Sequence, residues 1–171
     1  MSDSNKVADL KEKLKQALNS TFKVISDDFK LNDKFEKTKN SKKLDHFELD
    51  NLNSKNDFIK ARAESDSSAL KRKFSDEDIF KKNLPSNSSC KSLYTIAEKI
   101  RYESLGSKML KGIEKNFKDN YNQMISSKRK DQLKTKEDVS VAEAFELYML
   151  KNFHNLELNS LTMKMLSFWE N

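Results

Sequence analysis

The helical character of the chain is decided by residues 93–117, which read LYTIAEKIRYESLGSKMLKGIEKNF. Apolar residues in its first half recur at three- and four-residue steps, the spacing of one helix face. They are Leu93, Ile96, Ala97 and Ile100. A second stripe with this spacing contains Met109, Ile113, Phe117, Tyr121 and Met124. Between the two, Gly106 either supplies a left-handed cap or lies within one long helix, and the spacing permits both.

Helical signals continue upstream of this segment. Asn53 or Ser54 can cap a helix that runs to about Lys73. Its predicted inward residues are Phe58, Ala61, Ala69 and Leu70. A short helical turn over residues 76–83 ends before Leu84-Pro85, because the residue before a proline is pushed out of the helical region. The chain then restarts as a helix at Ser88 or Ser89.

Downstream, the clearest boundary is at Val141. Ser140 and Glu143 have the spacing of a capping box, and Val139 with Ala144 has that of a hydrophobic staple. Residues on one side of the helix that follows are Ala144, Phe145, Tyr148 and Phe153. A last helix, capped by Asn159 or Ser160, carries Leu161, Met165, Leu166 and Trp169. Because Trp169 ends this apolar stripe, we predict that it is buried and closes the core.

The first fifty residues have a weaker pattern. A first amphipathic helix is indicated by Val7, Leu10, Leu14, Ala17 and Leu18. A short strand is possible near residues 22–25, where Phe22, Val24 and Ile25 cluster. The polar segment 34–43 is predicted to be a loop, and residues 126–138 an exposed linker.

Composition agrees with a mainly α fold. The 171 residues include only two glycines and one proline, whereas an all-β fold normally needs many of both in its turns. We therefore predict a single-domain helical bundle of about five to six helices, with more than about half of the residues helical. Residues 1–53 form an amino-terminal helix plus a poorly ordered polar segment, and residues 54–171 form the helical core domain.

Chemical motifs are scarce. The single cysteine, Cys90, cannot form an internal disulfide, and His46 and His154 lack the spacing of metal ligands. There is no glycine-rich phosphate loop and no paired-histidine helix. We therefore expect no catalytic residue, no bound cofactor and no metal site in this segment. No run approaches the roughly 20 apolar residues of a membrane span, so we expect a cytoplasmic protein without membrane contact.

The net charge of +6 raises the question of nucleic-acid binding. The segment from Lys108 to Lys136 holds nine basic residues against three acidic ones. Lysines dominate, however, whereas base and phosphate recognition favours the bidentate guanidinium of arginine. We take a solvated face as the simplest explanation, and a stand-alone module that contacts nucleic acid or an acidic protein through residues 108–136 as the alternative function.

A denser group of charges lies just upstream. Glu98 and Arg101 are one helical turn apart and can pair, and Glu103 and Lys108 follow closely. One interpretation is a surface ion pair of less than about 1 kcal/mol. The functional interpretation is a charged patch of Glu98, Arg101, Glu103 and Lys108 that docks a partner protein.

The chain resembles the amino-terminal region of the CobT subunit of aerobic, ATP-dependent cobaltochelatase. The central matching features are Glu98, Arg101 and Glu103, followed by Gly106-Ser107, Met109, Gly112 and Asn116. Matching residues upstream are Arg62, Asp66, Ala69, Leu70 and Asp76. Downstream, VAEAFELYMLKNF and KMLSFWEN fit the same family. The similarity is good over residues 54–171 and loose before them.

The resemblance implies a component of an ATP-dependent metal-inserting ligase, with no active site of its own in this segment. Such a subunit assists cobalt insertion into the corrin ring of hydrogenobyrinic acid a,c-diamide during cobalamin synthesis. Its implied partners are an AAA+ ATPase subunit and a large porphyrin-chelatase-like subunit, and cobalt, ATP and magnesium belong to the whole complex. The family's carboxy-terminal von Willebrand A-type domain is absent here. We therefore expect either the amino-terminal piece of a longer subunit or the product of a gene that has lost its second half.

Overall fold

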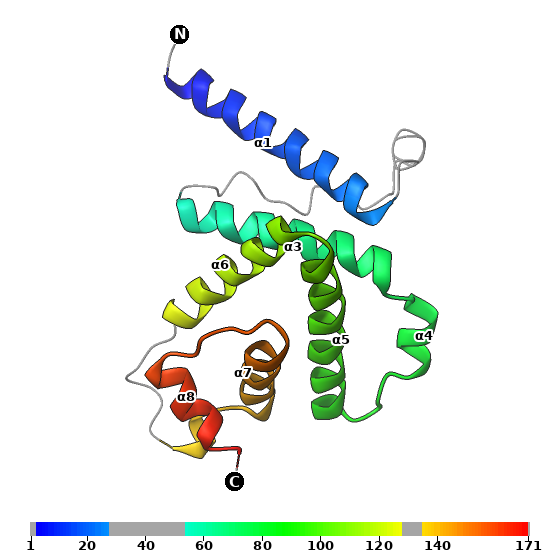
Figure 1. The fold of residues 1–171 in the computed structure, drawn as a ribbon, viewed down its shortest axis with the longest axis vertical. Helices are drawn as coiled ribbons and strands as arrows, with labels where there is room; N and C mark the ends of the chain where they lie inside the picture. Colours follow the sequence, from blue (N-terminus) through cyan, green and yellow to red (C-terminus); the bar gives the residue numbers. More distant parts are fainter. Residues whose placement is uncertain (1–2, 28–53, 128–134, 171) are drawn as a thin grey trace. The chain divides into compact units, whose positions relative to one another are not determined.

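The computed structural model describes residues 3–27, 54–127 and 135–170, and these ranges are helical almost throughout (Figure 1). The helices are α1 Asp3–Ser26, α3 Lys55–Phe74, α4 Glu77–Lys82, α5 Ser88–Met109, α6 Lys111–Ser127, η3 Lys136–Asp138, α7 Val141–Phe153 and α8 Ser160–Ser167. Helix accounts for 82% of the described residues and strand for none of them, which confirms the predicted mainly α fold. Within the same ranges, no helix is long and apolar enough to cross a membrane.

The chain divides into two compact units, residues 1–73 and residues 74–171. Helix α1 and all but the last residue of α3 belong to the first unit, and the remaining helices belong to the second. The predicted domain boundary after residue 53 stays a prediction. The predicted loop over residues 34–43 lies outside the described residues.

In the first unit, the predicted strand near residues 22–25 is wrong, because these residues form the last turns of α1. Phe22 and Ile25 are buried together with Leu18, and these three recur at four- and three-residue steps on one side of the helix. Val24 lies on another side and is 61% exposed. A short run of apolar residues does not distinguish strand from helix by itself, and here the longer helical period decided the structure.

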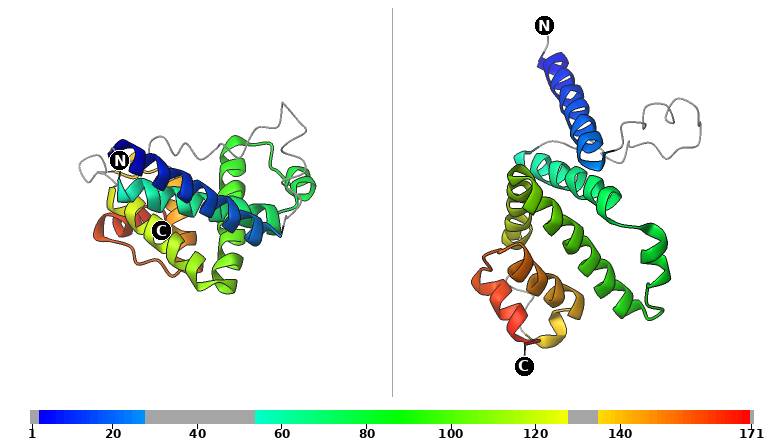
Figure 2. Two further views of the ribbon diagram at one scale, coloured as in Figure 1. Left: turned by 90° about the horizontal axis from the view of Figure 1, so that it is seen from above. Right: turned by 45° about the vertical axis from the view of Figure 1, so that its right-hand side comes forward.

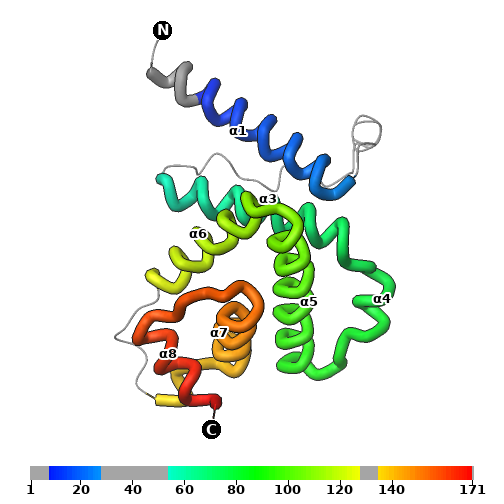
Figure 3. Tube along the Cα trace, viewed as in Figure 1, coloured from blue at the N-terminus to red at the C-terminus, as the bar shows by residue number. Residues whose placement is uncertain are grey.

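In the second unit, α5 packs against both α6 and α7, and α7 packs against α8. Figure 2 shows α5 as one continuous helix, and the trace in Figure 3 follows the chain from its end through a tight turn into α6. The largest apolar and aromatic side chains of this unit that are almost completely buried are Ile100, Phe117, Tyr121, Leu147, Leu150 and Met165. The apolar faces of four helices thus meet in one core.

Side-chain caps set the starts of these helices. The Asn87 side chain accepts from the amides of Ser89 and Cys90, so α5 begins at Ser88. The Ser140 hydroxyl accepts from the Glu143 amide at 3.2 Å, which confirms the predicted start of α7 at Val141. The predicted caps at Ser54 and Asn159 are also confirmed, since each side chain accepts from an amide three residues on.

Gly106 is neither a left-handed cap nor part of a single helix that joins α5 to α6. It is buried within α5, whose last residue is Met109. The break falls at Leu110, where the backbone is extended and the amide donates to the Gly106 carbonyl at 3.0 Å. The helix therefore passes through the glycine and ends one turn later.

Several side chains predicted to be inward are exposed, and Trp169 is the most informative of them. It is 36% exposed because α8 ends at Ser167, which takes Trp169 off the helical stripe. Its indole Nε1 donates to the Val139 carbonyl at 3.2 Å. Phe58, Met109, Tyr148 and Phe153 are exposed as well. The prediction that Trp169 closes the core is therefore wrong.

Candidate functional site

The four residues of the predicted docking patch all lie on α5, but not on one side of it. Arg101 and Lys108 are exposed and Glu98 is half-buried, whereas Glu103 is only 1% exposed. Five residues along a helix correspond to a rotation of about 140°, so Glu103 points away from Glu98. The structure therefore brings Glu98, Arg101 and Lys108 together on one side of α5 and places Glu103 in the interior.

Arg101 links α5 to the connection between α3 and α4. Its Nε and Nη2 donate to the two carboxylate oxygens of Glu98 at 2.7 and 2.8 Å. Nη2 also donates to the carbonyl of Phe74 at 2.7 Å, and the Ser75 hydroxyl donates to Glu98 at 2.6 Å. The hydrogen bonds that Arg101 donates to Glu98 raise the pKa of Arg101. The pair is thus a structural anchor, with part of the guanidinium still in contact with solvent.

Exposed apolar side chains accompany the cations on the same side of α5. Leu105 is exposed four residues after Arg101, and Met109 is 56% exposed next to Lys108. We call Arg101, Leu105, Lys108 and Met109 the α5 face. This face was not predicted, because Met109 had been placed in the stripe that continues into α6. The four-residue steps from Arg101 to Leu105 and from Leu105 to Met109 would have indicated a shared side of the helix.

Glu103 belongs to a buried polar cluster with Tyr121 of α6 and His154 at the end of α7. The Tyr121 hydroxyl donates to Glu103 Oε2 at 2.6 Å. Burial, together with the neighbouring Glu103 carboxylate, raises the pKa of Tyr121, so the hydroxyl keeps its proton and remains a donor. We call Glu103, Tyr121 and His154 the buried cluster. It brings polar side chains of α5, α6 and the end of α7 together within an apolar core, with a hydrogen bond between the first two.

His154 differs from Glu103 and Tyr121 in that its buried ring nitrogen Nε2 makes no hydrogen bond within the described residues. Its Nε2 lies 3.9 Å from Glu103 Oε2. Burial lowers the pKa of His154 to about 4, and the positive charges of Lys99 and Lys118 act in the same direction. The negative charge of Glu103 by itself would favour the protonated imidazolium form of His154. At this depth, however, the free-energy cost of removing water from the charged imidazolium is larger than the gain from Glu103. We conclude that His154 is neutral near pH 7.

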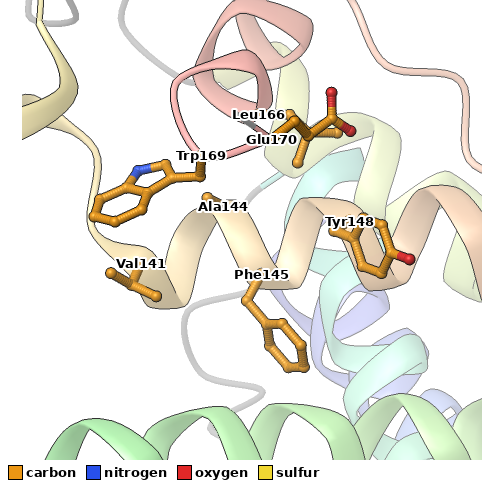
Figure 4. Close-up of a pocket in the computed structure, with 7 residues that line it drawn as sticks. All are labelled: Val141, Ala144, Phe145, Tyr148, Leu166, Trp169 and Glu170. Atoms are coloured by element: carbon orange, nitrogen blue, oxygen red, sulfur yellow. The ribbon is translucent and has the colours of Figure 1, made fainter.

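A cavity of about 410 Å³ opens between α7 and α8. It is lined by Val141, Ala144, Phe145, Tyr148, Leu166, Trp169 and Glu170, and we call it the α7/α8 groove (Figure 4). Six of these seven residues are apolar or aromatic. Lys136 of η3 lies over the Trp169 ring at 4.3 Å from its centroid, at the edge of the groove. A cavity of this volume and character is typical of a site that accepts an apolar group.

Comparison with known proteins assigns the chain to a protein family. The family described as cobalamin biosynthesis protein CobT matches residues 8–171. The chain is a member of the CobT family. No curated protein and no solved structure matched it. Family membership places the chain in cobalamin biosynthesis.

The residues that carry the resemblance to CobT have structural roles for the most part. Glu98 and Arg101 form the anchor at Phe74, and Glu103 accepts the Tyr121 hydroxyl. Upstream residues buried in the fold are Asp66, Ala69 and Leu70. Lys108 is exposed, and whether it and its neighbours dock a partner stays a prediction. The pattern that identified the CobT family thus describes how these helices are held together.

Proposed function

We propose that this CobT-family chain is a domain of a cobaltochelatase subunit. In this role it assists ATP-dependent cobalt insertion into hydrogenobyrinic acid a,c-diamide, as a scaffold that couples an AAA+ ATPase subunit to a large porphyrin-chelatase-like subunit. Cobalt is the substrate of the assembly, and ATP and magnesium belong to the whole complex. Membership in the CobT family supports the pathway, and the α5 face supports the scaffolding role.

The observation that carries the scaffolding role is the composition of the α5 face. Leu105 and Met109 expose apolar surface beside two cations, Arg101 and Lys108. Methionine and arginine are enriched in protein interfaces, and arginine is among the side chains that carry most of the binding energy. The opposite side of α5 is buried against α6 and α7, so the face is held rigidly before any partner arrives. A preorganised surface loses less conformational entropy on binding.

A pull-down with the AAA+ subunit tests this proposal. Met109→Glu places a carboxylate at the end of the α5 face, and Lys108→Glu reverses the charge beside it. We expect each change to weaken capture of the ATPase subunit by at least about tenfold, the size of a moderate interface contribution. The matched control is Lys91→Glu, an exposed lysine near the other end of α5.

Thermal melting separates binding from folding in this experiment. Both face variants replace exposed side chains, so their unfolding free energies should stay within about 0.5 kcal/mol of the parent. Undiminished capture by Met109→Glu and Lys108→Glu would place the docking surface elsewhere. Equal loss in the Lys91→Glu control would show that the effect is one of net charge.

A further inference from the structure

The α7/α8 groove leaves apolar surface uncovered in the second unit. Val141, Tyr148 and Trp169 line it and remain exposed, and Phe145 lies half-buried between the first two. Val141, Phe145 and Tyr148 follow one another at steps of four and three, so they form a row along α7 about 10 Å long. The other side of α7 is buried in the core through Ala144, Leu147 and Leu150. Helix α7 therefore has two apolar sides, and within the residues that the structure describes one of them lacks a cover.

Helix α1 carries a matching row that is at least partly exposed among the described residues. One side of α1 is buried through Leu18, Phe22 and Ile25. Beside it, Leu10 is 64% exposed, Leu14 is half-buried and Ala17 is exposed. These three also follow at steps of four and three, so the α1 row has the same spacing and length as the row on α7.

The net charges of the two segments that carry these rows are opposite, although Lys136 lies at the edge of the groove. Residues 135–170, which contain η3, α7 and α8, hold six acidic and three basic residues, whereas the whole chain holds 27 acidic and 33 basic. Glu170 lines the groove itself. Helix α1 has the opposite balance, with five lysines and three acidic residues. A basic amphipathic helix therefore fits the acidic surroundings of the groove, since opposite charges guide encounter and orientation.

We propose that the α7/α8 groove is a self-association site that receives helix α1 of a second copy of this chain. The α1 row, Leu10, Leu14 and Ala17, lies along the row of Val141, Phe145 and Tyr148 in the other copy. An amphipathic helix in an apolar groove is a recurrent mode of recognition, with anchors at such helical spacings. Because each chain has both the helix and the groove, two copies can exchange helices in a closed, symmetric dimer. This association uses neither the α5 face nor the ATPase subunit, so it is independent of the proposed docking role.

Sedimentation of the full chain tests the proposal with two variants. Leu10→Glu, the α1 variant, places a charge in the α1 row, and Tyr148→Glu, the groove variant, places one in the groove. We expect the parent chain to dimerise with rising concentration and each variant alone to associate at least about tenfold more weakly. An equimolar mixture of the two should recover association, because it still contains intact helices in one variant and intact grooves in the other. Circular dichroism melts of both variants establish that they are folded.

Trp169 provides a second readout without any label. It is the single tryptophan of the chain, it lines the groove and it is 36% exposed. Burial beneath a docked helix should shift its emission to shorter wavelength as the parent chain is concentrated. The α1 variant leaves the groove untouched and should show no such shift by itself.

Disulfide trapping locates the contact. In a Cys90→Ser background, chains with Leu10→Cys and chains with Tyr148→Cys are mixed and oxidised, and we expect a cross-linked product of twice the chain mass. The control pairs Tyr148→Cys with Val24→Cys, an exposed site on α1 about 21 Å from residue 10, and should cross-link poorly. A parent chain that stays monomeric up to about 100 µM would overturn the proposal. So would a variant mixture that fails to associate, or a Leu10→Cys, Tyr148→Cys double variant that cross-links only within one chain.

Discussion

Replacing Tyr121 by phenylalanine tests whether the buried cluster stabilises the fold. The change removes one hydroxyl and keeps the ring, which packs against His154 with 5.7 Å between ring centroids. What is lost is the hydrogen bond that Tyr121 donates to Glu103 Oε2 at 2.6 Å. Both side chains are almost fully buried, so water does not readily replace the missing donor.

The expected cost follows from this geometry. A hydrogen bond to a charged group contributes about 1.5–3 kcal/mol, and its loss is felt fully when the acceptor stays buried. In a protein of this size, each kcal/mol lowers the melting temperature by about 2–4 °C. Tyr121→Phe should therefore lower the melting temperature by roughly 3–12 °C.

Thermal and urea unfolding, followed by circular dichroism, measure this cost. The matched control is Tyr148→Phe, which removes the same atom from a tyrosine that is 47% exposed and should change stability by less than about 0.5 kcal/mol. If Tyr121→Phe is no more destabilising than Tyr148→Phe, the hydrogen bond to Glu103 does not stabilise the fold, and the reasoning is refuted.

Three further changes test other parts of the structure. The folded-state pKa of His154, about 4, lies below the ordinary 6.5, so the unfolded chain takes up the proton first and the free energy of unfolding falls by up to about 3 kcal/mol between pH 6.5 and 4. Urea unfolding at pH 7 and pH 4.5 should therefore show a smaller pH dependence in His154→Leu, and an equal one would contradict a buried neutral imidazole. Ser140→Ala removes the cap of α7 and should cost about 1 kcal/mol in the same assay, whereas Ser160→Ala, one residue beyond a cap, should be nearly neutral. Arg101→Ala should cost about 1–2 kcal/mol because it releases the Phe74 carbonyl, and an unchanged melting temperature would show that the anchor is dispensable.

Local chemistry explains why most helix boundaries could be predicted. Ser54, Ser140 and Asn159 each satisfy amides at a helix start with their own side chains, an interaction within three residues that the sequence shows directly. The errors arose where a distant contact or an early helix end decided the outcome. Trp169 is exposed because α8 ends two residues before it, and no strong stop signal marks that end. Phe22 and Ile25 are helical because the period of α1 extends to them.

In the candidate site, too, contacts between residues close in sequence could be predicted and contacts between distant residues could not. The pairing of Glu98 with Arg101 was predictable because the two are three residues apart on a helix. The contact of Arg101 with the Phe74 carbonyl was not, because it spans 27 residues. Nor was the bond between Tyr121 and Glu103, which joins α5 to α6. A charge pattern along one helix indicates which residues share a side, but the neighbouring helices decide which side is buried.

The two glutamates of α5, Glu98 and Glu103, help to separate residues that the fold needs from residues that are available for binding a partner. They are the same residue type, five positions apart on one helix, yet Glu98 holds an exposed arginine and Glu103 holds a buried tyrosine. Since both belong to the pattern that resembles CobT, that pattern is explained in large part by folding. Recognition of a partner then depends on side chains that the fold does not need. On α5 these are Leu105, Lys108 and Met109, whose substitution should change binding before it changes stability.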